Sequence, residues 1–236
     1  MKILLLSPEL FGFGGVQRFS RHVSLAFGRL AEVNQFQLFI NSLMDKEIDN
    51  YSPYLPGNPV ILISKGNKIR FVFNSLRIVS PKMRWIYATH LHLSPVAYFL
   101  KRINPSVKYA VHLHGIDIWG EISPLRKMAL QNADLLTTSS TFTAEKALSR
   151  HRLSAEKIRV LNPPIDPFWL QNILNHSSSL ESGKENKGKY LLTVARLDAA
   201  DQQKGVDDVI RAFSLLSPEY PDLRYRIVGK GSDQKR

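Results

Sequence analysis

The sequence predicts an α/β fold built on a doubly wound, parallel sheet. Short apolar runs alternate with longer segments whose apolar residues recur at the spacing of a helix, beginning with 2–7 and 15–30. The short runs are apolar throughout rather than at every second residue, as expected of strands that helices cover on both faces. This alternation is typical of strand–helix–strand units with crossover connections.

The expected elements follow one another with few interruptions. The first run is too short for a signal peptide and is read as a strand. The first helix carries its apolar stripe at positions such as Val16, Phe19 and Val23. Further strands are expected at 36–41, 59–64, 84–92, 107–114, 134–140 and 157–162, and further helices within 63–85 and at 94–103, 124–133 and 140–151.

A second, smaller unit is expected near the end of the sequence. The stretch "KYLLTVA" predicts a strand, "GVDDVIRAFSLL" a helix and "LRYRIVG" another strand. We therefore divide the chain into a first Rossmann-like domain at 1–174, a flexible polar linker at 175–188 and the start of a second Rossmann-like domain at 189–236. A doubly wound sheet needs about five or six strands to bury its faces, so the second domain is expected to be incomplete.

The composition limits the classes of partner. The formal net charge is +12, from 32 Lys and Arg against 20 Asp and Glu, which favours an anionic partner such as a phosphorylated ligand, a membrane surface or nucleic acid. Nucleic-acid binding rests on charge alone, because no recognised motif accompanies it. There is no cysteine, so disulfides and thiolate zinc sites are excluded, which suits a cytoplasmic protein.

The stretch 63–85 is basic and contains no acid. Its cations alternate with apolar residues such as Ile69 and Phe73. Two interpretations stay open: a basic amphipathic helix that lies on an anionic membrane, or a helix that packs on the core with a solvated basic face.

Arg196 and Lys204 flank a polar loop between a predicted strand and a predicted helix. In a doubly wound sheet, ligands bind at the carboxyl ends of the strands, beside the amino ends of the following helices. A diphosphate bound there would meet two cations and a helix dipole. The alternative is that both cations pair with acids of the same loop and helix, namely Asp198, Asp201 or Asp207.

The segment "FGFGGVQR" (11–18) occupies the position of a phosphate-binding turn after the first strand. It lacks the third glycine of the dinucleotide fingerprint, because Gln17 stands there. Gly14 and its neighbours would still allow a ligand to approach the main chain closely, although a plain tight turn explains them as well.

Histidines mark the ends of two predicted strands. His112 and His114 lie two residues apart, with Asp117 close behind, and His90 and His92 repeat the pattern. A metal site is disfavoured, because the pairs are on separate strands and no cysteine is present. A histidine at a strand end is a better candidate for holding a sugar hydroxyl or a developing charge.

Together these segments resemble the retaining glycosyltransferases of family 4. The resemblance rests on their order along nearly the whole chain: Gly14 to Arg18, "HLHGIDIWG", "NADLLTTSSTFTAEKAL", "KIRVLNPPID", "VARL" with "QQKGVDDVIRAF", and "YRIVGKG". It implies the GT-B fold, with two Rossmann-like domains, and retention of the anomeric configuration.

The resemblance also implies roles for particular residues. Arg196 and Lys204, with Gly205 beside them, would grip the diphosphate of a nucleotide-sugar donor and stabilise the charge that builds up on it. His114 would contact the transferred sugar near the reacting carbon. By the same resemblance, Gly14 and Gly15 would let donor phosphate and acceptor approach the main chain, and Asp117 would orient His114 or bind acceptor.

The chain departs from this family in one respect. The paired glutamates that hold the donor in family members come later than residue 236, so activity of this chain alone is not expected. The resemblance implies hexosyl transfer to a glycan or lipid-linked acceptor in exopolysaccharide or envelope synthesis, with no cofactor, in the cytoplasm or at the inner face of the membrane. The alternative is a non-catalytic module that binds an acceptor or a partner transferase.

Overall fold

A computed structural model describes residues 1–49, 52–176, 189–199 and 204–234. The chain divides into two compact units, Met1–Pro167 and Phe168–Arg236. The first domain was expected from the sequence to reach residue 174. The expected linker, 175–188, lies almost entirely outside the described residues.

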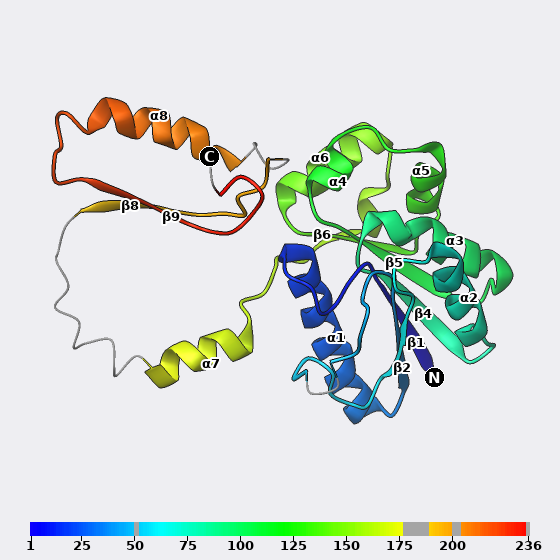
Figure 1. The fold of residues 1–236 in the computed structure, drawn as a ribbon. Coiled ribbons are helices and arrows are strands. Elements are labelled where there is room, and N and C mark those ends of the chain that lie inside the picture. The colour runs from blue at the N-terminus through cyan, green and yellow to red at the C-terminus, as the bar shows by residue number, and fades with distance from the viewer. Residues whose placement is uncertain (50–51, 177–188, 200–203, 235–236) are drawn as a thin grey trace. The chain divides into compact units, whose positions relative to one another are not determined.

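Unit 1 is built on a parallel sheet of seven strands (Figure 1). The strand order is β3-β2-β1-β4-β5-β6-β7, so the direction of winding reverses between β1 and β4. In such sheets this reversal opens a crevice at the carboxyl ends of the strands, where ligands bind. The strands are β1 (Lys2–Ser7), β2 (Gln37–Ser42), β3 (Val60–Ile63), β4 (Met83–Ala88), β5 (Lys108–Leu113), β6 (Leu135–Thr138) and β7 (Ile158–Val160).

Helices cover both faces of this sheet. One face packs on α1 (Gly15–Asn34) through a cluster that includes Leu5, Phe19 and Val23. The other face carries the larger apolar cluster, to which α2, α3, α5 and α6 contribute. These helices are α2 (Lys68–Ile78), α3 (Ser94–Ile103), α5 (Pro124–Gln131) and α6 (Thr141–His151), with the single turns η1 (Leu91–Leu93), α4 (Ile116–Trp119) and η2 (Ala155–Lys157) between elements.

The doubly wound parallel sheet expected from the sequence is confirmed. In β1, residues 3–7 are all buried, and in β5 residues 109–113 are all buried. Consecutive residues of a strand point to opposite faces, so complete burial requires cover on both sides. The uninterrupted apolar runs therefore correctly predicted a sheet covered by helices on both faces.

Two segments differ from the expectation. The strand expected at 84–92 ends at Ala88, because the chain turns into η1 with the His90 side chain as its cap. No helix was expected directly after the strand at 157–162, but α7 (Pro167–His176) follows it, with Pro167 at its first position. Proline suits that position because its missing N–H is one that a first turn leaves unpaired.

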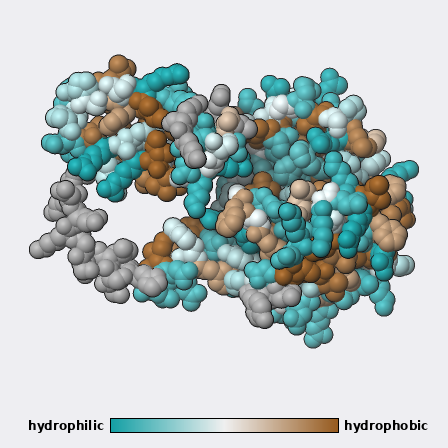
Figure 2. All heavy atoms as spheres, in the orientation of Figure 1, coloured by the Kyte–Doolittle hydropathy of each residue, from teal (hydrophilic) through white to brown (hydrophobic). Residues whose placement is uncertain are grey.

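Unit 2 contains one strand–helix–strand motif. β8 (Tyr190–Val194) pairs in parallel with β9 (Arg224–Val228), and α8 (Val206–Leu216) connects them. None of its described residues is buried. Figure 2 shows hydrophobic residues on its surface. Val194 is 72% exposed and Leu215 is 81% exposed.

Among the described residues, no helix combines the length and the apolar character needed to cross a membrane.

Candidate functional site

Gly14 shapes the turn between β1 and α1. Its φ of 143° lies in the region that favours glycine, and a Cβ there would lie 2.4 Å from Oε1 of Gln17. Gly15 begins α1 and faces open space. The first turn of α1 holds no acid and no side-chain cap, so its main-chain N–H groups are available to an anion.

A buried carboxylate fixes the loop that leads to this turn. Asp45, which follows β2, accepts hydrogen bonds from the main-chain N–H of Leu10 at 2.8 Å and of Phe11 at 3.1 Å. Arg21 of α1 donates to the carbonyl oxygens of Leu10 and Gly12. Neither Asp45 nor Arg21 was predicted from the sequence to be a functional residue. The signal available was an acid placed just after a predicted strand end.

The main chain at the end of β5 is held by Asp117. Its carboxylate accepts from the N–H of Gly115 at 2.7 Å and, more weakly, from the N–H of His114 at 3.4 Å. The His114 ring is oriented by another group, because its Nε2 lies 2.8 Å from the carbonyl oxygen of Thr89. Asp117 therefore shapes the turn, and Thr89, just after β4, fixes the imidazole.

The two histidine pairs meet at the strand ends. The ring centroids of His112 and His114 lie 4.5 Å apart, those of His114 and His90 5.4 Å apart, and those of His90 and His92 4.6 Å apart. Phe19 of α1 stacks on His112 at 3.8 Å and meets His114 edge-on at 5.2 Å. The strand ends of β4 and β5 and the helix α1 thus share one histidine cluster.

Burial keeps these imidazoles neutral. Desolvation lowers the pKa of His112 to about 2 and, with positive neighbours and despite Asp117, that of His90 to about 4. It also lowers the pKa of His114, against the opposing effects of the Thr89 carbonyl and Asp117. Near pH 7 each ring therefore has one N–H donor and one lone-pair acceptor.

In the ranges that the structure describes, no group of three or more His, Asp or Glu side chains is arranged so that it could hold a metal ion. The neutral rings of the cluster carry hydrogen-bonding groups, and Asp117 is engaged by the main chain.

In unit 2, Arg196 lies just beyond the carboxyl end of β8. The residues that follow β8 run beside the residues that follow β9. The N–H of Leu197 donates to the carbonyl oxygen of Lys230 at 2.9 Å. This approach requires glycine opposite: a Cβ on Gly229 would lie 1.8 Å from the Ala195 oxygen, and one on Gly231 1.7 Å from the Leu197 oxygen. The "VGKG" segment thus lets the two strand ends run together.

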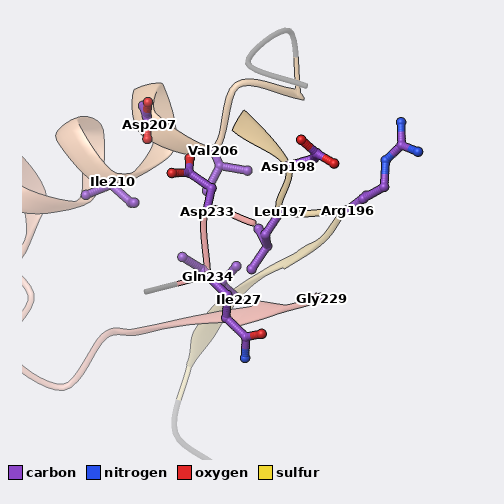
Figure 3. A pocket seen from close by; sticks show the side chains of 10 residues that line it. All are labelled: Arg196, Leu197, Asp198, Val206, Asp207, Ile210, Ile227, Gly229, Asp233 and Gln234. Carbon is purple, nitrogen blue, oxygen red and sulfur yellow. The ribbon is translucent and has the colours of Figure 1, made fainter. Parts of the chain in front are cut away.

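A hollow of about 500 Å³ opens beside this strand end (Figure 3). Its charged lining consists of Arg196 against Asp198, Asp207 and Asp233, so carboxylates outnumber cations there. In Figure 3 the Arg196 side chain extends away from the other side chains of the lining. Lys204 does not line the hollow.

Lys204 is exposed, and Gly205 caps α8 with a φ of 67°. The positive φ accounts for a glycine at this helix start. Residues 200–203, which include Asp201, lie outside the described residues. The predicted site residues thus form two sets, one on unit 1 (Gly14, Gly15, His114 and Asp117) and one on unit 2 (Arg196, Lys204 and Gly205).

The sheet of unit 1 and the strand–helix–strand motif of unit 2 define an α/β protein of the GT-B fold. The sequence matches no family model and no curated protein. Solved structures do match the fold. The chain is similar to HepE from Anabaena, solved in complex with UDP, with a TM-score of 0.59 and 15% identity over 99% of this chain and 70% of that one.

Two further structures show the same fold. A glycosyltransferase from Rickettsia africae matches with a TM-score of 0.57 and 11% identity, over 98% of this chain and 69% of that one. The lipopolysaccharide outer core galactosyltransferase WaaB, in its apo form, matches with a TM-score of 0.64 and 16% identity. That match covers this chain completely but 62% of WaaB, less than two thirds of its length.

Proposed function

We propose that this chain is part of a nucleotide-sugar-dependent, retaining glycosyltransferase similar to those of family 4. One observation carries the proposal: Arg196 follows β8 and Lys204 immediately precedes the Gly205 cap of α8, within a parallel strand–helix–strand motif. This is the position at which such motifs bind phosphate groups. The similarity to solved glycosyltransferases supports it at the level of the fold.

The chemistry assigns distinct roles to the two units. Cleavage of the sugar–phosphate bond leaves additional negative charge on the diphosphate, and Arg196 and Lys204 stabilise that charge more in the transition state than in the ground state. On unit 1, Gly14 and Gly15 present main-chain N–H groups to the donor phosphate and acceptor, and His114 holds the transferred hexose. The acceptor is a glycan or a lipid-linked glycan.

Product analysis tests the proposal. The full chain would be incubated with UDP-, GDP-, ADP- and dTDP-hexoses, with and without lipid-linked glycan acceptors, and the anomeric proton of the product followed by NMR. We expect at least one of these donors to bind, and any product that forms to keep the anomeric configuration of the donor sugar. Inversion at this carbon would refute the retaining assignment, and failure to bind any of these donors would refute the assignment to a nucleotide-sugar transferase.

A second candidate is a non-catalytic module that binds an acceptor or a partner transferase. The observation that favours it is the acidic lining of the hollow in unit 2, because Asp198, Asp207 and Asp233 oppose an anion there. In the enzyme proposal the diphosphate is therefore held by Arg196 and Lys204 and not by the hollow itself. Nucleotide binding without transfer to any acceptor would favour the second candidate.

A membrane contact is the remaining part of the proposal. The outer side of α2 exposes Ile69 at 83% and Phe73 at 57%. Exposed cations lie on α2 and in the segments that adjoin it in the sequence, namely Lys65, Lys68, Arg70, Arg77, Lys82 and Arg84, and Arg77 lies over the Phe73 ring. Apolar side chains among cations suit the surface of an anionic bilayer, and this contact would bring a lipid-linked acceptor to unit 1.

A further inference from the structure

We propose that His90 is a second sugar-binding residue, and that His90 and His114 together bind two adjacent hydroxyl groups of a hexose. The inference rests on the proposed function, because it names the group that the His114 site receives. Its evidence is the hydrogen-bonding role that the main chain imposes on each of the two rings.

The tautomer of His90 is set by η1. The main-chain N–H of His92 donates to Nδ1 of His90 at 3.1 Å, so Nδ1 carries a lone pair. A neutral imidazole has one protonated nitrogen, and the proton of His90 therefore sits on Nε2. His90 thus presents a hydrogen-bond donor.

The tautomer of His114 is set in the same way. Its Nε2 lies 2.8 Å from the carbonyl oxygen of Thr89, which can only accept, so Nε2 carries the proton. The remaining nitrogen, Nδ1, is a lone-pair acceptor. His114 therefore presents a group complementary to that of His90.

Both remaining nitrogens are available to a ligand. The side chains of His90 and His114 are partly exposed. Among the described residues, His90 Nε2 and His114 Nδ1 have no hydrogen-bond partner within the protein. Neither atom is among the buried side-chain atoms that lack a partner. Nε2 of His112, by contrast, is buried.

A donor beside an acceptor matches a pair of hydroxyls. One hydroxyl of a hexose donates to Nδ1 of His114, and its neighbour accepts from Nε2–H of His90. The ring centroids are 5.4 Å apart and the ring planes are tilted by 34°, so one hexose is large enough to reach both rings. A fully ionised phosphate has no proton to give to Nδ1, and the neutral rings offer it no charge, so the pair favours a sugar over an anion.

The test uses the full chain with ¹⁵N-labelled imidazoles, and correlates ring nitrogens with ring protons by NMR. Without ligand, we expect the Nε2–H tautomer for both His90 and His114. Methyl α-D-glucopyranoside and its galactose counterpart are then titrated in, and we expect one or both to shift Nε2 of His90 and Nδ1 of His114. Sulfate, which carries no proton near neutral pH, is the anionic control and should leave both nitrogens unchanged.

Three variants separate a direct contact from a structural role. His90→Gln keeps a side-chain N–H donor and should retain glycoside binding. His90→Phe keeps a ring without the donor and should weaken binding about fivefold, the loss of one neutral hydrogen bond. His92→Gln changes an exposed side chain but keeps the main-chain N–H that sets the His90 tautomer, so binding should be unchanged.

Several results would overturn the inference. They are an Nδ1–H tautomer of His90 in the wild-type chain, shifts caused by sulfate but by neither glycoside, and wild-type affinity in a folded His90→Phe. The wild-type tautomer decides the question even where a variant does not fold. Glycoside binding involves unit 1 alone, so its persistence in Arg196→Gln distinguishes this inference from the proposed diphosphate site.

Discussion

Replacement of Asp45 by alanine is predicted to destabilise unit 1 and to release the loop before Gly14. The carboxylate, 4% exposed, accepts three hydrogen bonds: from the N–H of Leu10, from the N–H of Phe11, and from the hydroxyl of Ser42 at 2.6 Å. Its removal leaves donors that water reaches poorly, each worth about 1–3 kcal/mol when buried. Because the Ser42 hydroxyl can rotate and the Phe11 N–H is only partly buried, we expect a loss of about 3–5 kcal/mol in the free energy of unfolding.

Urea unfolding, followed by tryptophan fluorescence, measures this loss. The measurement is made in a Trp169→Phe background, so that only Trp85 and Trp119 of unit 1 report. Asp45→Asn retains an oxygen for two of the three donors and should lose about half as much. Glu121→Ala removes a carboxylate whose side chain is 92% exposed and should leave the midpoint unchanged.

The reasoning fails if Asp45→Ala unfolds at the wild-type midpoint, since the carboxylate would then not be holding the loop. It also fails if the asparagine and alanine variants lose the same stability, since the acceptor oxygens would then not be the cause.

The remaining predictions concern the histidine cluster and α2. Phe19→Ala should lower the free energy of unfolding by about 3–5 kcal/mol and broaden the NMR signals of the His114 ring, because Phe19 packs on His112 and His114; unchanged stability would contradict this packing role. The free energy of unfolding should fall as the pH is lowered from about 6.5 toward 4. The unfolded chain then binds protons at His90 and His112, whereas the lowered pKa values of these rings prevent the folded chain from binding them. The loss should be at most about 1.4 kcal/mol per pH unit for each ring. Urea midpoints across this range should change less steeply in His112→Leu, and an equally steep change would refute the assignment. The wild-type protein should sediment with anionic liposomes, and a variant in which Arg70, Arg77 and Lys82 are replaced by glutamate should not. The control variant, in which the exposed cations Arg29, Arg102 and Arg150 are replaced by glutamate, should still sediment. Equal binding by both variants would rule out this face.

Much of the fold could be predicted because burial on two faces leaves a strong pattern in the sequence. The uninterrupted apolar run of β1 identified a covered strand, and the helix at 94–103 was predicted with the bounds that α3 has. The end of β4 could not be predicted, because it depends on one side-chain hydrogen bond, from the N–H of His92 to the ring of His90. The start of α7 had a readable signal in Pro167, outweighed by the prolines that precede it.

The candidate site was only partly predictable for a related reason. Strand ends are visible in a sequence, so the residues placed there could be named: Gly14, His90, His114 and Arg196. The roles of their partners could not be read. Asp117 binds main-chain N–H groups instead of the His114 ring, and the ring is oriented by a carbonyl oxygen of Thr89. Main-chain groups carry no sequence signal, so tautomers follow only from coordinates.

The binding of a nucleoside diphosphate by unit 2 tests the central claim most directly. Isothermal titration with UDP would compare the wild-type chain, the double variant Arg196→Gln with Lys204→Gln, and Arg224→Gln. Arg224 begins β9, at the opposite end of the parallel strands from Arg196, and is the matched control. The account predicts that wild type and Arg224→Gln bind alike and that the double variant binds about 100-fold more weakly, as expected for two charge-assisted contacts. Equal affinity in all three proteins, or no binding by any of them, would contradict it.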